Sequence, residues 1–357
     1  MTKSAKQAIG QRLLAAFRAA GATEVAPDIL LDAATLLDLY GEDIRARAYV
    51  TSDPVRGEVV LRPDFTVPVV RMHMQTGAEP ARYCYLGEVF RKQDHGETRP
   101  PHPRDNEYLQ AGFEVFARDP ASDAELFALF HRLLAPYRLA STMGDMDILL
   151  DAVAALPVSP PRKAALLHHI WRPVRFSRLL KRFSAPVTPR HFPASAAPWT
   201  GLRGPDELEA RLALLAAEPG EVPLPPEWID RLTRLFAIDA PAPQALAGLR
   251  DLAQDIPAIS EAVTRLAQRL NQLAERGLDP ASIRFAASHG RETMEYYDGM
   301  TFTFTAPDHP DWPPVASGGR YDALTAQLGA MTGAARTIPA VGGIIRPGLI
   351  AELEASC

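Results

Sequence analysis

Two groups of polar residues, far apart in the chain, carry side chains that could bind a small zwitterion. The first group lies between residues 61 and 114, and the second begins at residue 295. Carboxylate, hydroxyl and amide oxygens accept hydrogen bonds from an ammonium group, and a guanidinium binds a carboxylate. Apolar neighbours frame both groups, which favours a pocket. The candidate pocket residues are Asp64, Thr66, Arg91, Gln110, Glu114, Tyr296 and Tyr297.

The elements that must position these residues follow from hydrophobic spacing. Residues 5–20 have the period of an amphipathic helix that ends at Gly21, and residues 29–40 also have helical spacing. Residues 66–75 are expected to form a helix capped by Thr66. Apolar patterns predict strands of one antiparallel sheet at residues 58–62, 82–90 and 107–116.

The middle of the chain, from about residue 156 to 277, differs in composition from its flanks. It is rich in alanine, leucine, arginine and proline, and proline clusters divide it into short helices. Beyond it, strict alternation over residues 301–305 predicts a strand, and the last apolar stretch is 338–350. We therefore expect one core built from residues 1–155 and 278–357, interrupted by a mainly helical insertion.

Composition restricts the class of protein. The 357 residues are 47% hydrophobic and 23% charged with a net charge of -5, which is typical of a soluble globular protein. The apolar stretches are too short for a membrane span, and we expect no secretory signal. Cys84 and Cys357 are the only cysteines, so we expect no disulfide framework and a cytoplasmic location. The mild acidity argues against a wide nucleic-acid footprint.

Five short segments occur in an order that resembles the catalytic domain of histidyl-tRNA synthetase. They are LRPxxT at 61–66, FR at 90–91, QxxxE ending a strand at 110–114, a YY strand at 296–297 and GGRYD at 318–322. Together they span nearly the whole chain and are far more specific than any one of them. The resemblance implies an α+β fold of the class II aminoacyl-tRNA synthetase type, with a six- or seven-stranded antiparallel sheet and flanking helices. Two families share this core: the synthetases and their paralogues, the regulatory subunits of ATP phosphoribosyltransferase.

The resemblance assigns the pocket residues to the three chemical groups of a histidine ligand. Asp64, Thr66 and Gln110 match the positions that hold the ammonium, with Asp64 replacing the family's glutamate. Glu114 and Tyr297 match the positions that face the imidazole. The guanidinium of the set would bind the carboxylate. Without the ordered motifs, the simpler explanation would be structural, with carboxylates on a helix start and a sheet face and the tyrosines in the core.

The residues that would hold a nucleotide depart from the family pattern at three places. Gln93 stands where the synthetases have a glutamate, Glu292 where they have an arginine, and Leu349 where a helix carries an arginine against the adenine. Arg291 lies one residue from the lost position, which on a strand turns it to the opposite face unless a bulge intervenes. Arg346 lies three residues before the other lost position. We expect histidine binding without amino-acid activation, and neither a metal nor a cofactor.

These departures favour the regulatory paralogue over the synthetase. A synthetase would also need a further domain of roughly a hundred residues to bind the anticodon, and we expect none after the core. By resemblance, the chain would be a non-catalytic subunit for the first step of histidine biosynthesis. It would activate a short catalytic subunit, transmit inhibition by histidine and form a homodimer, built around residues 24–40, within a hetero-oligomer. Two alternatives stay open: a truncated synthetase-like enzyme that activates an amino acid, and an amino-acid- or tRNA-binding module.

Other patterns have simpler explanations. The histidines at 168–169, 95 and 102 lack acidic or thiol partners at ligand spacing, so we expect no metal site. Ser288–His289 has no oriented acid and is not expected to be a nucleophile pair. The segment 317–322 lacks the ending of a P-loop, and we expect a turn against the pocket. Five basic residues recur at helical spacing and fit a solvated helix face better than a surface for RNA or an acidic partner. They are Arg172, Arg175, Arg178, Lys181 and Arg182.

Overall fold

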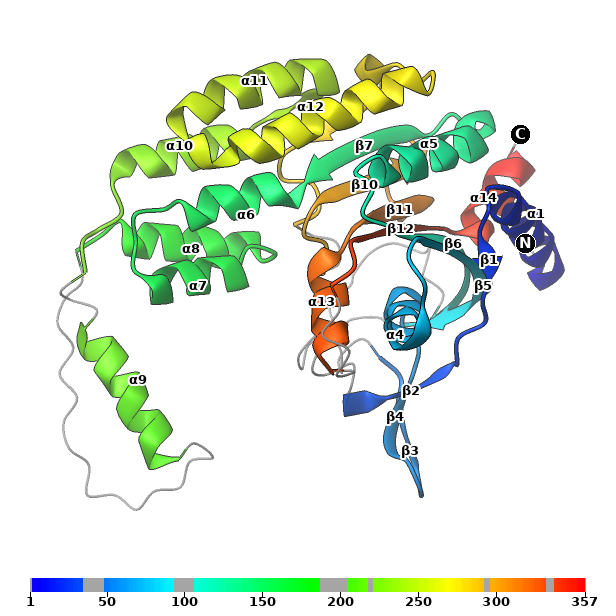
Figure 1. The fold of residues 1–357 in the computed structure, drawn as a ribbon, viewed down its shortest axis with the longest axis horizontal. Helices are drawn as coiled ribbons and strands as arrows, with labels where there is room; N and C mark the ends of the chain where they lie inside the picture. The colour runs from blue at the N-terminus through cyan, green and yellow to red at the C-terminus, as the bar shows by residue number, and fades with distance from the viewer. Residues whose placement is uncertain are drawn as a thin grey trace.

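The computed structural model describes most of the chain, namely residues 2–34, 48–92, 106–186, 204–217, 221–291, 296–331 and 337–356. A nine-stranded sheet forms its centre, in the order β1-β5-β6-β12-β11-β10-β7-β9-β8 (Figure 1). Every neighbouring pair from β5 to β7 is antiparallel. These six strands are β5 (Ala81–Phe90), β6 (Glu107–Phe116), β12 (Ala340–Ile345), β11 (Ala316–Arg320), β10 (Met300–Thr305) and β7 (Ala140–Asp145).

Three short strands extend this sheet at its edges. β1 (Thr23–Glu24) runs parallel to β5, and at the other edge β9 (Arg284–Ala286) runs parallel to β7. β8 (Asp239–Pro241) pairs antiparallel with β9, so a segment within residues 156–277 adds a strand to the sheet. The predicted α+β class, with an antiparallel central sheet and flanking helices, is confirmed.

Helices cover both faces of the sheet and enclose two hydrophobic cores. On one face the rings of Phe17 and Phe113 lie 5.5 Å apart, and on the other Phe65 stacks on Tyr85 at 4.2 Å between ring centroids. The pleat of β6 accounts for the division, because Phe113 and Val115 enter the first core whereas Phe116 enters the second. The first face carries α1 (Lys3–Ala19), α5 (Ser122–Leu134) and α14 (Pro347–Ser356), and the second carries α4 (Thr66–Thr76) and α13 (Asp322–Met331).

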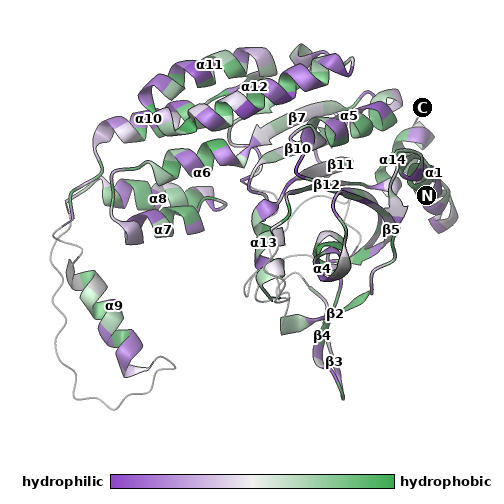
Figure 2. Ribbon diagram, in the orientation of Figure 1, coloured by the Kyte–Doolittle hydropathy of each residue, from purple (hydrophilic) through white to green (hydrophobic). Residues whose placement is uncertain are grey.

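A group of helices lies beside the β7 end of the sheet, and we call it the helical layer. Prolines begin several of its helices, where their fixed backbone and missing N–H suit the first turn. Hydrophobic and hydrophilic positions alternate along these helices (Figure 2), and α12 packs on α5, α6 and α11. The helical layer comprises α6 (Met146–Ala154), α7 (Pro160–His168), α8 (Pro173–Phe183), α10 (Pro226–Phe236), α11 (Ala242–Asp255) and α12 (Ser260–Glu275). The helix α9 (Pro205–Ala217) stands apart from this layer in Figure 1.

A separate three-stranded sheet projects below α4 in Figure 1, in the order β2-β4-β3. It is formed by β2 (Leu30–Asp32), β3 (Val50–Asp53) and β4 (Gly57–Leu61). The predicted helix over residues 29–40 is therefore wrong at its start, because Leu30–Asp32 pairs with Val59–Leu61. Residues 35–40 lie outside the described part of the chain. The strand expected near residues 58–62 exists, but it belongs to this sheet and not to the central one. Backbone pairing between distant segments has overridden the local helical pattern.

Four further expectations about the motifs are corrected. The side chain of Thr66 does not cap α4: the cap position is Phe65, and the carboxylate of Asp64 accepts the Val67 N–H at 3.3 Å. The residues from 317 to 320 form part of the central strand β11 and not a turn. Gln110 and Glu114 lie within β6, which continues to Phe116. The segment at 296–297 has no strand structure.

Among the described helices, none combines the length and hydrophobicity of a membrane span.

Candidate functional site

Glu114 lies at the centre of the polar residues predicted from the sequence. It is fully buried on β6, on the face covered by α4 and α13. Its Oε1 accepts hydrogen bonds from the hydroxyls of Thr66 at 3.2 Å and Tyr85 at 2.9 Å. Its Oε2 accepts one from the hydroxyl of Tyr321 at 2.6 Å. The two halves of the chain thus meet at one carboxylate.

The surroundings of Glu114 are polar, and among the described residues its hydrogen-bond donors are all neutral hydroxyls. Burial raises the pKa of Glu114 to about 7, although the hydroxyls of Tyr321, Tyr85 and Thr66 act in the opposite direction. The nearby charge of Asp64 raises the pKa further. An ionised carboxylate offers about four acceptor positions, and the protein itself fills three of them. The arrangement leaves acceptor capacity for an N–H group of a ligand.

Glycines make room for the pocket side chains. In the strand register Gly342 lies opposite Glu114, and a β-carbon on Gly342 would overlap Oε2 of that carboxylate. Gly112 lies opposite Tyr85, where a β-carbon would overlap the tyrosine ring. These two glycines are therefore required by space and not by backbone conformation.

The phenol of Tyr297 marks the other wall of the site. Only 8% of Tyr297 is exposed, and its ring lies 4.8 Å from that of Tyr296. Burial raises the pKa of Tyr297, the charges of Glu114 and Asp64 raise it further, and Arg91 lowers it. These effects require the three charged groups to lie near the phenol. The Nε of Arg91 donates to the Pro63 carbonyl at 2.7 Å, which anchors the guanidinium beside the LRPxxT segment.

Gln110 supplies an acceptor that the protein does not use. The side chain is 2% exposed, and its Nε2 lies 3.5 Å from the hydroxyl of Tyr108. Its Oε1 is buried without a hydrogen-bond partner in the described structure. Gln110 has the same strand parity as Glu114, so both project from the same face of β6. An unpartnered buried acceptor is costly, and a ligand ammonium would satisfy it.

Two residues of the site were missed by the sequence interpretation. Tyr321 belongs to the GGRYD motif, and its position there was a usable signal. Tyr85 had no such signal, because its contact with Glu114 depends on the pairing of β5 with β6. The ring of Tyr321 also lies 6.1 Å from that of Tyr296, which closes the tyrosine wall.

The two arginines near the expected nucleotide site make different contacts, and the guanidinium of Arg346 lies 6.0 Å from the ring centroid of Tyr108, which neighbours Gln110. The Nε of Arg291 donates to the Ile170 carbonyl at 2.8 Å, and its guanidinium lies 4.4 Å from the ring centroid of Phe236. These contacts turn Arg291 into the helical layer. The guanidinium of Arg346 donates to the Pro314 carbonyl. Gln93 and Glu292 lie outside the described residues, and Leu349 packs against the first core.

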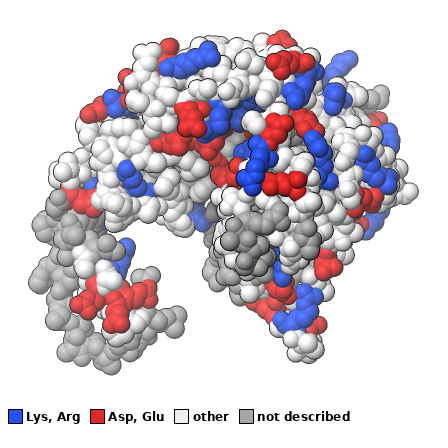
Figure 3. Space-filling model, viewed as in Figure 1, with Lys and Arg blue, Asp and Glu red and all other residues white. Residues whose placement is uncertain are grey.

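The other residues considered from the sequence are a histidine after a serine, candidate metal ligands and a basic helix face. The ring nitrogens of His289 meet the hydroxyls of Thr301 at 2.9 Å and Thr303 at 3.0 Å, and burial lowers the pKa of His289 to about 4. Within the described residues no group of three or more His, Cys, Asp and Glu side chains could hold a metal. The predicted exposed basic face on α8 is confirmed for four of its five residues, whereas the fifth, Arg172 at the N-cap position, is half-buried. The four exposed residues are Arg175, Arg178, Lys181 and Arg182. Charges of both signs are interspersed on the face shown in Figure 3.

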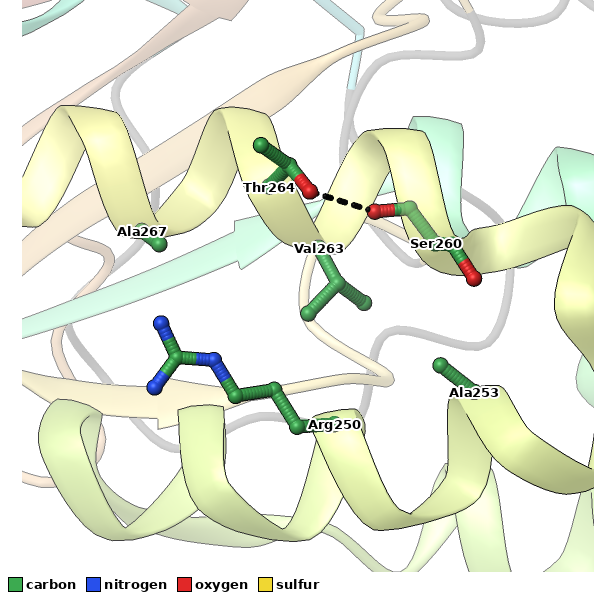
Figure 4. A pocket seen from close by; sticks show the side chains of 6 residues that line it. All are labelled: Arg250, Ala253, Ser260, Val263, Thr264 and Ala267. Atoms are coloured by element: carbon green, nitrogen blue, oxygen red, sulfur yellow. Dashed lines mark hydrogen bonds between the residues drawn. The ribbon is translucent and has the colours of Figure 1, made fainter.

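A surface cavity of about 240 Å³ lies between α11 and α12, away from Glu114 (Figure 4). Its polar groups are the guanidinium of Arg250 and the hydroxyls of Ser260 and Thr264. The Thr264 hydroxyl already donates to the Ser260 carbonyl at 2.8 Å. None of the seven predicted pocket residues lines this cavity.

Comparison with known proteins places the chain in a family. The family profile described as Histidyl-tRNA synthetase matches residues 2–186 and 207–344. The chain is 30% identical to the ATP phosphoribosyltransferase regulatory subunit of Agrobacterium fabrum and 34% identical to that of Mesorhizobium japonicum, over 92% of each chain.

Solved structures share the fold at lower sequence identity. A structure titled as an ATP phosphoribosyltransferase regulatory subunit/histidyl-tRNA synthetase from Bacillus halodurans superimposes with a TM-score of 0.71 at 18% identity, covering 98% of this chain and 79% of that one. A histidine–tRNA ligase subunit from Alicyclobacillus acidocaldarius has a TM-score of 0.61 at 22% identity, covering 99% of this chain and 93% of that one. With its class II synthetase-like sheet and its full-length similarity to these relatives, the chain belongs to the family of ATP phosphoribosyltransferase regulatory subunits, within the wider histidyl-tRNA synthetase family.

Proposed function

We propose that the chain is a regulatory, non-catalytic subunit of ATP phosphoribosyltransferase in the first step of histidine biosynthesis. It activates a short catalytic subunit and transmits feedback inhibition by histidine. Similarity along 92% of the chain to proteins of that name supports the regulatory role. The observation that carries the histidine part is the buried Glu114 carboxylate, whose hydrogen-bond donors within the described part of the chain are neutral hydroxyls.

The pocket offers a partner for each charged or polar group of histidine. An imidazole N–H donates to Glu114, beside the phenol of Tyr297. The ammonium meets Asp64, Thr66 and the Oε1 of Gln110, which is buried without a hydrogen-bond partner among the described residues. The guanidinium at position 91 binds the carboxylate, and Tyr296 packs against the neighbouring phenol. Each contact is charge-assisted or satisfies a buried group, which makes it strong.

The same proposal assigns no chemistry to the chain itself. Activation of an amino acid needs groups that neutralise a triphosphate and its leaving pyrophosphate. Arg291 instead donates to the carbonyl of Ile170, and Arg346 to that of Pro314. The phosphoribosyl transfer would belong to the catalytic subunit.

Reconstitution with a short catalytic subunit tests the regulatory role. We expect formation of phosphoribosyl-ATP to require the chain and to fall when histidine is added. The isolated chain should bind histidine in calorimetry and give no histidine-dependent exchange of pyrophosphate into ATP. Exchange above background would contradict the non-catalytic assignment.

The variant Glu114→Ala tests the pocket. Removal of the carboxylate leaves an imidazole N–H unpaired, which costs roughly 1–3 kcal/mol, so histidine affinity should fall by about 5–150-fold. The inhibition curve of the reconstituted enzyme, normalised to its own uninhibited rate, should move to higher histidine concentration. Glu125→Ala is the matched control, because Glu125 is a surface carboxylate paired with Arg82 at 2.9 Å. Unchanged affinity together with a sharp fall in Tm would make Glu114 a structural residue only.

A synthetase-like enzyme is the second candidate, and the match to the Histidyl-tRNA synthetase profile favours it. The pyrophosphate exchange assay separates the two, since only an activating enzyme produces an aminoacyl adenylate. A role in binding tRNA would instead appear as a gel shift without exchange.

The assembly is part of the proposal. We expect a homodimer within a hetero-oligomer, a core of residues 1–155 and 278–357, and a mainly helical insertion between them. The cytoplasm is the expected compartment, from the cysteine content alone. Light scattering of the reconstituted complex measures the stoichiometry, and a monomeric regulatory subunit in the active complex would contradict the dimer.

A further inference from the structure

Two of the three pocket tyrosines in the C-terminal half, Tyr297 and Tyr321, are followed directly by an aspartate. Tyr297 is followed by Asp298, and Tyr321 lies between Arg320 and Asp322. Successive residues of an extended chain project to opposite faces. Accordingly, the hydroxyl of Tyr321 donates to Glu114 on the pocket face, whereas the guanidinium of Arg320 donates to Asp123 of α5, on the opposite face.

Asp123 of α5 connects β11, which ends at Arg320, to the helical layer. Its Oδ1 accepts from Nε and Nη2 of Arg320 at 3.0 and 2.6 Å. Its Oδ2 accepts from Nε of Arg269 at 3.0 Å and forms an ion pair with Nη2 at 2.8 Å. Arg269 belongs to α12 and also bonds Asp145, at the end of β7, at 2.8 Å. Asp123, Asp145 and Arg269 are all buried, so solvent does not loosen these bonds.

The segments that hold the two tyrosines are also tied to each other. The carboxylate of Asp298 accepts the backbone N–H groups of Asp322 at 3.0 Å and Ala323 at 2.5 Å. The N–H of Asp298 donates to the carbonyl of Arg320 at 3.0 Å. On the other side, Arg265 of α12 binds Asp147 at 3.0 Å. The N–H of Asp147 donates to Asp145 at 3.1 Å, and Asp145 bonds Arg269, so a continuous series of bonds runs from the pocket to two successive turns of α12.

We propose that the Arg320–Asp123–Arg269 series couples occupancy of the Glu114 pocket to the position of α12, with Arg269 as a positioning residue. The proposal rests on the proposed function, which makes histidine the pocket ligand. Three hydroxyls already occupy acceptor positions of Glu114. An imidazole N–H that takes the remaining acceptor position draws on the same carboxylate charge and weakens the hydrogen bond from the Tyr321 hydroxyl, which shifts the segment containing Arg320. Because the guanidinium forks on Asp123 have fixed geometry, Arg269 and α12 follow.

Hydrogen exchange with and without histidine tests the link. We expect saturating histidine to change amide exchange in α12 by about tenfold, within the range of about 5–150-fold that is typical of coupled sites. Arg269→Lys keeps the charge but cannot bond both carboxylates through a fork. In this variant the response of α12 should vanish, while β6 still responds and histidine Kd changes by less than about threefold. Arg234→Lys is the control, because its pair with Asp255 at 2.7 Å is an exposed ion pair of the same helical layer.

A second pair of variants removes the dependence on a ligand. Tyr321→Phe deletes the hydroxyl that bonds Glu114 and should alter α12 exchange at least about fivefold without histidine. Tyr83→Phe, whose hydroxyl meets His73 at 3.1 Å, should leave α12 unchanged. An α12 that responds neither to bound histidine nor to Tyr321→Phe, or that responds equally in Arg269→Lys, overturns the coupling. If calorimetry detects no histidine binding, the proposed ligand fails, and the Tyr321→Phe comparison still decides the coupling.

Discussion

Glu114 and Asp123 are buried carboxylates on opposite faces of the same sheet, yet their surroundings shift their pKa values in opposite directions. Glu114 receives neutral hydroxyls, and burial raises its pKa to about 7. Burial would also raise the pKa of Asp123, but the charges and hydrogen bonds of Arg269 and Arg320 lower it below the ordinary value. The first carboxylate is left without a bonded counter-ion and suits a ligand, whereas the second is satisfied within the protein. Burial alone therefore does not identify a binding site, and the charge of the partners does.

The largest difference between the two sites should appear when a counter-ion is removed. Arg269→Ala leaves Asp123 and Asp145 buried with one ionic partner fewer, which should destabilise the protein by about 3–5 kcal/mol. Arg234→Ala removes an exposed partner and should cost less than about 1 kcal/mol. Unfolding in guanidinium chloride measures both. Equal losses for the two variants would mean that burial of the network contributes nothing to its energy.

On the pocket side, a larger side chain on β12 should destabilise the protein nearly as much. Gly342→Ala places a β-carbon where Oε2 of Glu114 lies, and overpacking of this kind costs about 1–3 kcal/mol. Histidine affinity should fall as well, because the carboxylate must turn away. Gly248→Ala in α11 is the control: its nearest neighbour would be Ile238 Cδ1 at 3.9 Å, and alanine favours a helix by about 1 kcal/mol. Wild-type stability and affinity in Gly342→Ala would show that Glu114 is not confined there.

The smallest expected effect is on the pH dependence of the free energy of unfolding. The two carboxylates should change this free energy in opposite directions as pH rises. Between 4.5 and about 7, folded Glu114 holds a proton that the unfolded chain releases, so stability falls as pH rises, by at most about 1.4 kcal/mol per unit. Asp123 behaves oppositely: the unfolded chain binds its proton more readily, so stability falls as pH drops below 3.8.

Urea unfolding of wild type and Glu114→Gln isolates the contribution of Glu114. The difference matters because burial also raises the pKa of Asp147 to about 7 and of Asp298 to about 6. The two stability curves should diverge between pH 4.5 and about 7. Parallel curves in this window would mean that Glu114 is already ionised in the folded protein.

Local patterns were sufficient where one element buries one face. The helix predicted at 5–20 is α1, and the strands predicted at 82–90 and 107–116 are β5 and β6 within one residue at each end. In each case the apolar residues repeat at the period of the element, so the pattern and the burial agree. The segment at 29–40 failed because its pairing partner lies some thirty residues ahead, in β4.

The candidate site was predicted residue by residue, but its bonds were not. Motif order led to Glu114 and Thr66, and the structure joins them through a hydroxyl at 3.2 Å. The same hydroxyl had been expected to cap α4, because a threonine before an apolar run usually does so. Here Asp64 accepts the N–H of Val67 instead, which leaves the Thr66 hydroxyl to bond Glu114 on the sheet.

The amino-acid sequence by itself determined the family, the class of fold and the types of polar side chain available to the pocket, because these depend on local periodicity and on motif order. Tertiary structure alone decided which side chains meet. The register of β5 on β6 brings Tyr85 to Glu114. The antiparallel pairing of β11 with β12 brings Tyr321, which follows β11, to the same carboxylate. Strand pairing between distant segments sets these contacts, and a shift of one residue would have turned each side chain to the other face.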